Sequence, residues 1–270
     1  MVICSFPART YIRSIDGVLQ EAMFFGKPIF GKPNTNKESQ EQTLKLAEQA
    51  QKSGLKVFTM DFARTPAVID KALRMNAAKK FIPFVAPAKG RDLNSLPPYP
   101  KRPVNENPNS IVSLSTVRNF LRIGDSAAFG RQDEFTLKIH ETNYDLVIVD
   151  VFHGRSPLSK QAVETLKYKK IGGRRKVLAY MDIGSASSYL YYWKPYWREG
   201  SPLWISAPVR GDPDRFYVEY WNPEWQKIIT GDTKSYVYGA IDLGFDGVVL
   251  GGLDAYRYFE TGGEIPDEEQ

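Results

Sequence analysis

Five acidic residues lie at or just after the ends of segments with the composition of buried strands. They are Glu21, Asp61, Asp150, Asp182 and Asp254. In a barrel of parallel strands the carboxyl ends form the functional face, so these carboxylates would ring one mouth. Two carboxylates suit glycoside hydrolysis, because one protonates the leaving oxygen and the other attacks or activates water. The alternative is structural, since an acid in this position also caps a following helix.

Aromatic side chains accumulate in two Pro-interrupted stretches, "SSYLYYWKPYW" (187–197) and "FYVEYWNPEWQ" (216–226). Flat aromatic rings beside carboxylates suit the C–H faces and hydroxyls of sugar rings, although Trp and Tyr also serve as ordinary packing. Trp193, Tyr220 and Trp221 are the candidate sugar-binding rings of these stretches.

The composition argues against a nucleic-acid interface, a metal site and a membrane span. The 270 residues carry 36 Lys+Arg against 31 Asp+Glu, and the basic residues are scattered, which disfavours a nucleic-acid interface. One cysteine and two histidines leave little for a metal site, and nothing predicts a cofactor. No stretch reaches the 18 or so apolar residues of a membrane span, and the start is too short in apolar residues for a signal peptide.

Eight short apolar runs are candidate strands, and amphipathic segments separate several of them. The runs are 2–6, 14–19, 56–63, 119–123, 144–152, 176–184, 216–220 and 245–251. A helix is expected in "TNKESQEQTLKLAEQAQKSG", capped by Thr35 with Glu38 three residues later, and another in "SPLSKQAVETLKYKK". Strand–helix alternation predicts a parallel sheet covered by helices. A doubly wound sheet satisfies the same pattern, but the first strand lacks a Gly-rich phosphate loop, so a closed (β/α)8 barrel is preferred.

The Pro-rich segment 86–110 has no apolar period and is expected to be a linker. It leaves three candidate strands before it and five after it, in 117–260. Such a division suits one barrel formed by residues 1–270 better than two domains, with the chain crossing the surface at the linker. We therefore expect the first strand, in "MVICSF", to pair with "GVVLG" near the end.

The second part of the chain resembles glycoside hydrolase family 114, the endo-α-1,4-polygalactosaminidase-like barrels. The resemblance covers about residues 117–260 and rests on "KVLAYMDIG", "YWNPEW" and "GFDGVVLGGLDAYRYFE", in the order and spacing of the family. It is closest to a branch once given a cysteinyl-tRNA synthetase label, but the chain has no HIGH-type nucleotide motif. The resemblance implies a TIM-type barrel that acts on or binds amino-sugar polysaccharide.

The first part of the chain resembles the far end of the same family. "VICSF", "YIRSIDGVLQEAMFFG" and "KVFTMDFA…KKFIPFVAP" are similar to strands six to eight, and "RNFLRIG" is similar to strand one. The order is therefore rotated. Either the barrel is circularly permuted, with 1–90 supplying strands six to eight, or the chain is a window cut from tandem barrels. In both cases the outer helix between strands five and six is expected to be missing.

The family pattern places a carboxylate where this chain has Gly251 and retains the next acid as Asp254. Two family glutamates are replaced by Ser185 and Ser187, and the family's "PQN" by Ser5 and Phe6. Glu21 resembles the general acid, and Asp182 is a new acid where the family usually has Ser. By this resemblance the catalytic candidates are Glu21, Asp254 and Asp182. It also adds Asp61, Asp150 and Tyr180 to Trp193, Tyr220 and Trp221 as substrate-binding candidates.

Three functions follow from these observations. The first is a glycoside-hydrolase-like barrel with impaired or altered activity on α-1,4-galactosaminide chains, retaining or inverting. The second is a non-catalytic, carbohydrate-binding pseudoenzyme, and the third is a structural or partner-binding barrel. The expected partner is an oligo- or polysaccharide containing galactosamine, and the residues leave oligomeric state open. Because family members are often exported, the resemblance favours a secreted or periplasmic location.

Overall fold

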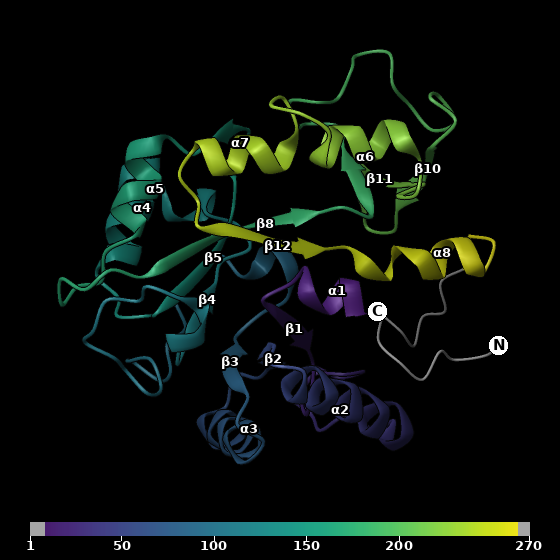
Figure 1. Ribbon diagram of the computed structural model, residues 1–270. Coiled ribbons are helices and arrows are strands. Elements are labelled where there is room, and N and C mark those ends of the chain that lie inside the picture. The colour runs from purple at the N-terminus through teal and green to yellow at the C-terminus, as the bar shows by residue number, and fades with distance from the viewer. Residues whose placement is uncertain (1–8, 264–270) are drawn as a thin grey trace. The chain divides into compact units, whose positions relative to one another are not determined.

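The computed structural model describes residues 9–263, which divide into two compact units (Figure 1). Unit 1 comprises the residues up to Gly124 together with 140–147 and 168–176, and unit 2 comprises 125–139, 148–167 and the residues from Val177 onward. The chain passes between the units after residues 124 and 167 and within α4 (Gln132–His140), β5 (Leu146–Asp150) and β8 (Lys176–Asp182).

Unit 1 begins as alternating strands and helices. Its elements are α1 (Arg9–Arg13), β1 (Gly17–Glu21), α2 (Lys37–Lys52), β2 (Lys56–Phe62), α3 (Pro66–Ala78), β3 (Ile82–Ala86), η1 (Gly90–Asp92), η2 (Leu114–Thr116) and β4 (Phe120–Arg122). β1, β2 and β3 pair in parallel in that order, with Gly17 opposite Lys56 and Phe58 opposite Ile82. This is the parallel sheet expected from the strand–helix alternation.

Both faces of β2 and β3 are covered within unit 1, as their almost uninterrupted apolar sequences require. Helices α2 and α3 pack on one face, where Ala47 and Ile69 join Val57 and Val85 in a buried cluster (Figure 1). On β2 and β3, Phe58 and Phe84 contact the ring of Phe120 at 5.4 and 5.5 Å between centroids. Helix α2 begins after Asn36, whose side chain accepts the Ser39 N–H, so Asn36 and not Thr35 is its cap.

Unit 2 combines a parallel pair with an antiparallel sheet. Its further elements are η3 (Ala127–Phe129), β6 (Phe152–His153), β7 (Ser156–Pro157), α5 (Lys160–Leu166), β9 (Ser185–Ser187), β10 (Ile205–Val209), β11 (Asp212–Val218), α6 (Pro223–Thr230), α7 (Tyr236–Asp242), β12 (Gly247–Gly251), η4 (Leu253–Ala255) and α8 (Tyr256–Glu260). β12 pairs in parallel with β8, with Gly247 opposite Leu178. β9, β10 and β11 form a separate antiparallel sheet of order β10-β11-β9.

The mixed α/β class and the parallel sheets are confirmed, but residues 9–263 show separate sheets and no closed barrel. The segment 216–220, expected as a strand of the parallel sheet, belongs largely to β11 and pairs antiparallel. Gly211, at φ +82°, lets the chain reverse between β10 and β11. The expected pairing of "MVICSF" with "GVVLG" lies outside the described residues, and the single permuted barrel stays a prediction.

Candidate functional site

Three predicted site residues of unit 2, Tyr180, Asp182 and Asp254, lie at or near the carboxyl ends of β8 and β12. Tyr180 and Asp182 alternate along β8 and therefore point to the same face of the sheet. Asp182, the last residue of β8, lies opposite Gly251, the last residue of β12. Asp182 therefore lies beside Gly251, the position at which β12 has no side chain.

Asp182 is held firmly at this edge. Its Oδ1 accepts hydrogen bonds from the backbone N–H groups of Gly184 and Ser185 at 3.0 and 2.9 Å. Its Oδ2 lies 3.4 Å from the guanidinium of Arg215 on β11. Burial raises the pKa of Asp182, and the charge of Arg215 and these hydrogen bonds only partly oppose it. The carboxyl group is oriented and has an increased tendency to carry a proton.

The two glycines of "LGGL" are explained by these neighbours. A Cβ on Gly251 would collide with the ring end and hydroxyl of Tyr180. A Cβ on Gly252 would collide with the carboxylate of Asp182, and Gly252 also has φ +70°, where a side chain is strained. Side chains from β8 therefore occupy the space that an acid on β12 would need.

The charges of Asp182 and Asp254 both act on Tyr217. Burial is the main cause that raises the pKa of Tyr217, and the negative charges of Asp254 and Asp182 add to it while Arg215 opposes it. The ring of Tyr217 stacks on that of Tyr258 with centroids 4.1 Å apart and planes 10° apart. Asp254 is exposed in η4, directly after β12. Two carboxylates, one guanidinium and stacked phenol rings thus share one environment.

An exposed aromatic group adjoins α8. Tyr220 and Trp221 follow β11 and are 38% and 47% exposed. The ring of Trp221 contacts those of Tyr220 and Phe259 with centroids 4.9 and 4.8 Å apart, and Phe259 contacts Tyr258 at 5.0 Å. This arrangement leaves accessible ring surface next to the phenol stack.

The remaining predicted residues of unit 2 lie elsewhere in its packing. Trp193 is partly buried and stacks on Phe216 at 5.2 Å. Asp150 ends β5, where its Oδ1 accepts the Phe152 N–H at 2.8 Å, and its charge contributes to the raised pKa of Tyr236, whose main cause is burial. Trp197 and Trp225, which belong to the same aromatic stretches, are core residues.

Glu21 and Asp61 belong to unit 1. Glu21 ends β1, and its Oε1 lies 2.7 Å from the guanidinium of Arg122 on β4. Asp61 is fully buried, with Oδ1 accepting the N–H groups of Phe24 and Phe25 and Oδ2 accepting the Asn76 amide. Burial raises the pKa of Asp61 despite these bonds. Asp61 therefore fixes the backbone of Phe24 and Phe25, in the loop that follows β1.

Sequence reasoning missed Arg215, Tyr217, Tyr258 and Phe259. Arg215 and Tyr217 alternate on β11, so both can face Asp182, but the expected strand began after Arg215. The aromatic run "AYRYFE" was a usable signal for Tyr258 and Phe259, because it follows Asp254 directly. Across residues 9–263, no His, Cys, Asp and Glu side chains are grouped to hold a metal ion. No helix in that range has the length and apolar character to cross a bilayer.

Comparison with known proteins gives relatives but no function. No family model matches the chain. It is 28% identical over 141 residues to an uncharacterized protein of Thermotoga maritima, covering 52% of this chain and 42% of that protein. An uncharacterized protein of Methanocaldococcus jannaschii is 29% identical over 161 residues, covering 60% and 44%. One of Deinococcus radiodurans is 32% identical over 119 residues, covering 44% and 36%. The chain thus spans less than half the length of these relatives.

Proposed function

We propose that the chain binds amino-sugar polysaccharide of the α-1,4-galactosaminide type through unit 2, and hydrolyses it slowly or not at all. The observation that supports binding is the exposed pair Tyr220–Trp221, packed on Phe259 and adjoining the phenol stack near Asp182 and Asp254. Aromatic faces take up the C–H faces of sugars, and two carboxylates against one Arg favour a ligand with protonated amines.

Slow hydrolysis is expected because the carboxylates are poorly disposed for it. Hydrolysis needs an acid and a second carboxylate on opposite sides of the scissile bond. Position 251 cannot supply one, since Tyr180 occupies that space, and Asp182 is already engaged by two N–H groups and Arg215. Asp182, with its raised pKa, is then the acid and Asp254 the partner in any residual reaction. Membership of a permuted family 114 barrel is the corresponding structural proposal.

The test is binding of a galactosaminide oligosaccharide, followed by tryptophan fluorescence and calorimetry. Trp221→Ala is expected to weaken binding about fivefold to tenfold, because it removes an aromatic contact worth roughly 1 kcal/mol or more. Tyr196→Ala is the control, since Tyr196 is a more exposed aromatic residue outside this group. N-acetylation of the ligand should also weaken binding by removing its positive charge.

A second assay measures release of reducing ends from the polymer. We expect little or none, and the double variant Asp182→Asn/Asp254→Asn should remove whatever is present. Equal affinity of Trp221→Ala and the unaltered protein would refute the binding site. Fast hydrolysis that survives the double variant would refute the assignment of the acids.

A further inference from the structure

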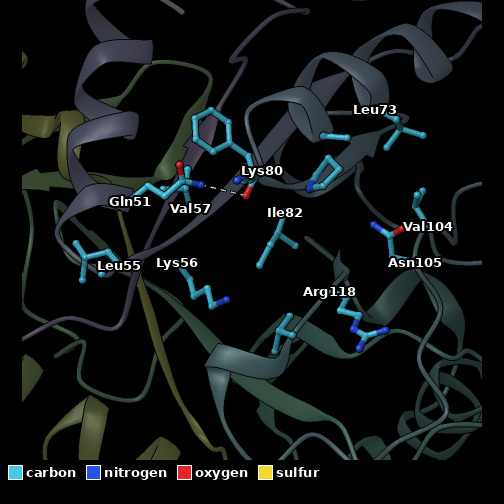
Figure 2. A pocket seen from close by; sticks show the side chains of 15 residues that line it. Gln51, Leu55, Lys56, Val57, Leu73, Lys80, Ile82, Val104, Asn105 and Arg118 are labelled. Atoms are coloured by element: carbon cyan, nitrogen blue, oxygen red, sulfur yellow. Dashed lines mark hydrogen bonds between the residues drawn. The ribbon is translucent and has the colours of Figure 1, made fainter.

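Unit 1 contains a cavity that the carbohydrate proposal does not use. Its volume is about 570 Å³, and it lies at the amino-terminal end of β2 and β3, whose first residues Lys56 and Ile82 line it (Figure 2). Asp61 lies near the other end of β2, and Glu21 ends the neighbouring strand β1 opposite Met60. A space of this volume accepts a small organic molecule.

All the charged residues that line this cavity are basic. Its fifteen residues include Lys56, Lys80 and Arg118 but no Asp or Glu. Within the part of the chain that the structure describes, no carboxylate pairs with any of these three side chains. Figure 2 shows Lys56 and Arg118 on two sides of the space with Ile82 between them. Three cations without a counter-charge around one cavity favour an anionic ligand.

The remaining walls are apolar and amide-bearing. Leu73 and Val104 are partly exposed apolar side chains of the lining, and Gln51 and Asn105 supply amide groups. Such a lining suits a ligand whose charged end is joined to an apolar or ring-shaped body. Inorganic phosphate would use the cations and leave the apolar wall uncovered.

Two residues that line the cavity have a left-handed backbone conformation. Residues 9–263 contain three non-glycine residues at positive φ, and two of them, Lys80 at 59° and Asn105 at 57°, line this cavity. Lys80 follows the end of α3, where glycine is the favoured residue because it has no Cβ. Lys80 therefore carries a side chain where many helix ends have glycine, whereas asparagine adopts this conformation readily.

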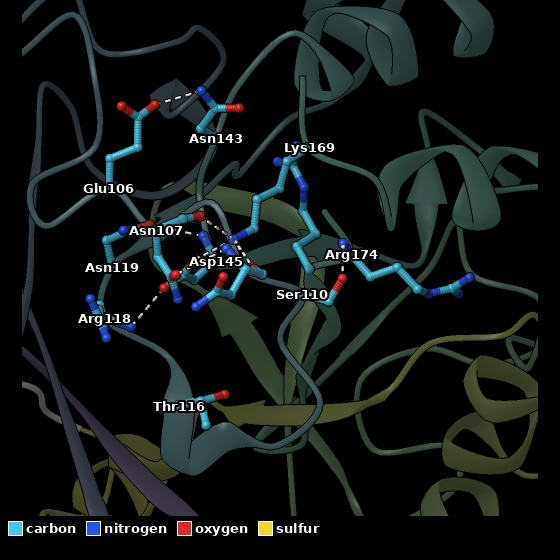
Figure 3. A network of polar contacts seen from close by, with 12 residues as sticks. Glu106, Asn107, Ser110, Thr116, Arg118, Asn119, Asn143, Asp145, Lys169 and Arg174 are labelled. Atoms are coloured by element: carbon cyan, nitrogen blue, oxygen red, sulfur yellow. Dashed lines mark hydrogen bonds and ion pairs between the residues drawn. The ribbon is translucent and has the colours of Figure 1, made fainter. Parts of the chain in front are cut away.

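Hydrogen bonds fix these residues in place. Gln51 donates to the Lys80 carbonyl at 3.1 Å, and the Asn119 amide donates to the Asn105 carbonyl at 3.2 Å. The backbone N–H of Arg118 donates to Asp145, which forms a fully buried ion pair with Lys169 (Figure 3). The cavity wall is therefore formed before any ligand arrives, which lowers the entropic cost of binding.

We propose that this cavity binds a small organic phosphate, with the phosphate held by Lys56, Lys80 and Arg118 and the organic body on the apolar wall. Lysine and arginine are the side chains that bind phosphate groups as point charges and forked donors. This proposal is independent of carbohydrate binding by unit 2.

The test is calorimetry with phenyl phosphate, inorganic phosphate and phenol at constant ionic strength. Phenyl phosphate is expected to bind at least tenfold more tightly than either of the others. Arg118→Gln should weaken its binding on the order of tenfold, because a charge-assisted hydrogen bond is lost. Lys45→Gln, on the exposed side of α2, removes the same charge outside the cavity and should leave affinity unchanged.

Lys80→Gly separates ligand binding from folding. Glycine relieves the strain at φ 59°, so this variant should unfold at the same or a higher temperature while binding phenyl phosphate several-fold more weakly. The proposal is overturned if phenyl phosphate does not bind, if it binds no better than inorganic phosphate, or if Lys45→Gln weakens binding as much as Arg118→Gln. Unchanged affinity in both cavity variants would overturn it as well.

Discussion

Lys169 is expected to be the residue of unit 1 whose loss is most costly. Its ammonium group is fully buried and donates to Asp145 Oδ1 at 2.6 Å and to the carbonyls of Asn107 and Asn109 at 2.7 and 2.9 Å (Figure 3). Asp145 in turn accepts the Arg118 N–H and is fully buried. This network fastens the end of the Pro-rich segment to the neighbouring strands.

The substitution Lys169→Met would leave one carboxylate and two carbonyls without their buried donor. Removing one partner of a buried ion pair costs about 3–5 kcal/mol. A chain of this size loses roughly 2 °C of melting temperature per kcal/mol, so a decrease of about 6–10 °C is expected. Urea and thermal unfolding followed by circular dichroism measure both quantities.

The neighbouring residue Lys170 provides a matched control. Its ammonium group also lies 2.6 Å from a carboxylate, that of Glu141, but both side chains are 59% exposed. Lys170→Met should therefore cost less than about 1 kcal/mol. If Lys169→Met costs no more than Lys170→Met, the argument from burial is refuted. Lys169→Met/Asp145→Asn should be less destabilised than Lys169→Met alone, because no charge is left unpaired.

Two further outcomes follow from the packing and the buried acids. Gly251→Ala should lower the free energy of unfolding by about 1–3 kcal/mol, because its methyl group overlaps the Tyr180 ring, and Tyr180→Ala should cancel much of that loss in a double-mutant cycle. Additive effects would contradict this contact. Asp61 has a raised pKa in the folded state, so the folded protein binds the extra proton and its stability decreases as pH rises from the ordinary pKa of 3.8 through the raised value. Asp61→Asn should lack this decrease in urea unfolding measured across pH, and an identical pH profile would exclude Asp61 as its source.

Local apolar runs located these parallel strands well. Residues 56–62, 176–182 and 247–251 form β2, β8 and β12 inside the expected segments. β2 is almost continuously buried, as a covered parallel strand requires, whereas β8 is buried at alternate residues and β12 has no buried residue. The run 82–86, absent from the eight periodic candidates but present in the family resemblance, forms β3. Segment 216–220 shows the limit of this reasoning, because an apolar run does not specify the direction of its partner.

The sequence by itself determined that acids follow the strands and that residue 251 carries no side chain. Only the tertiary structure decided what each acid faces: Asp61 holds the backbone of Phe24 and Phe25, Glu21 pairs with Arg122, and Asp182 pairs with Arg215. It also explained Gly251, whose missing side chain leaves room for Tyr180 from the adjacent strand. Residues so far apart in the chain meet through strand pairing and side-chain packing, and the spacing of residues along the sequence contains no record of those contacts.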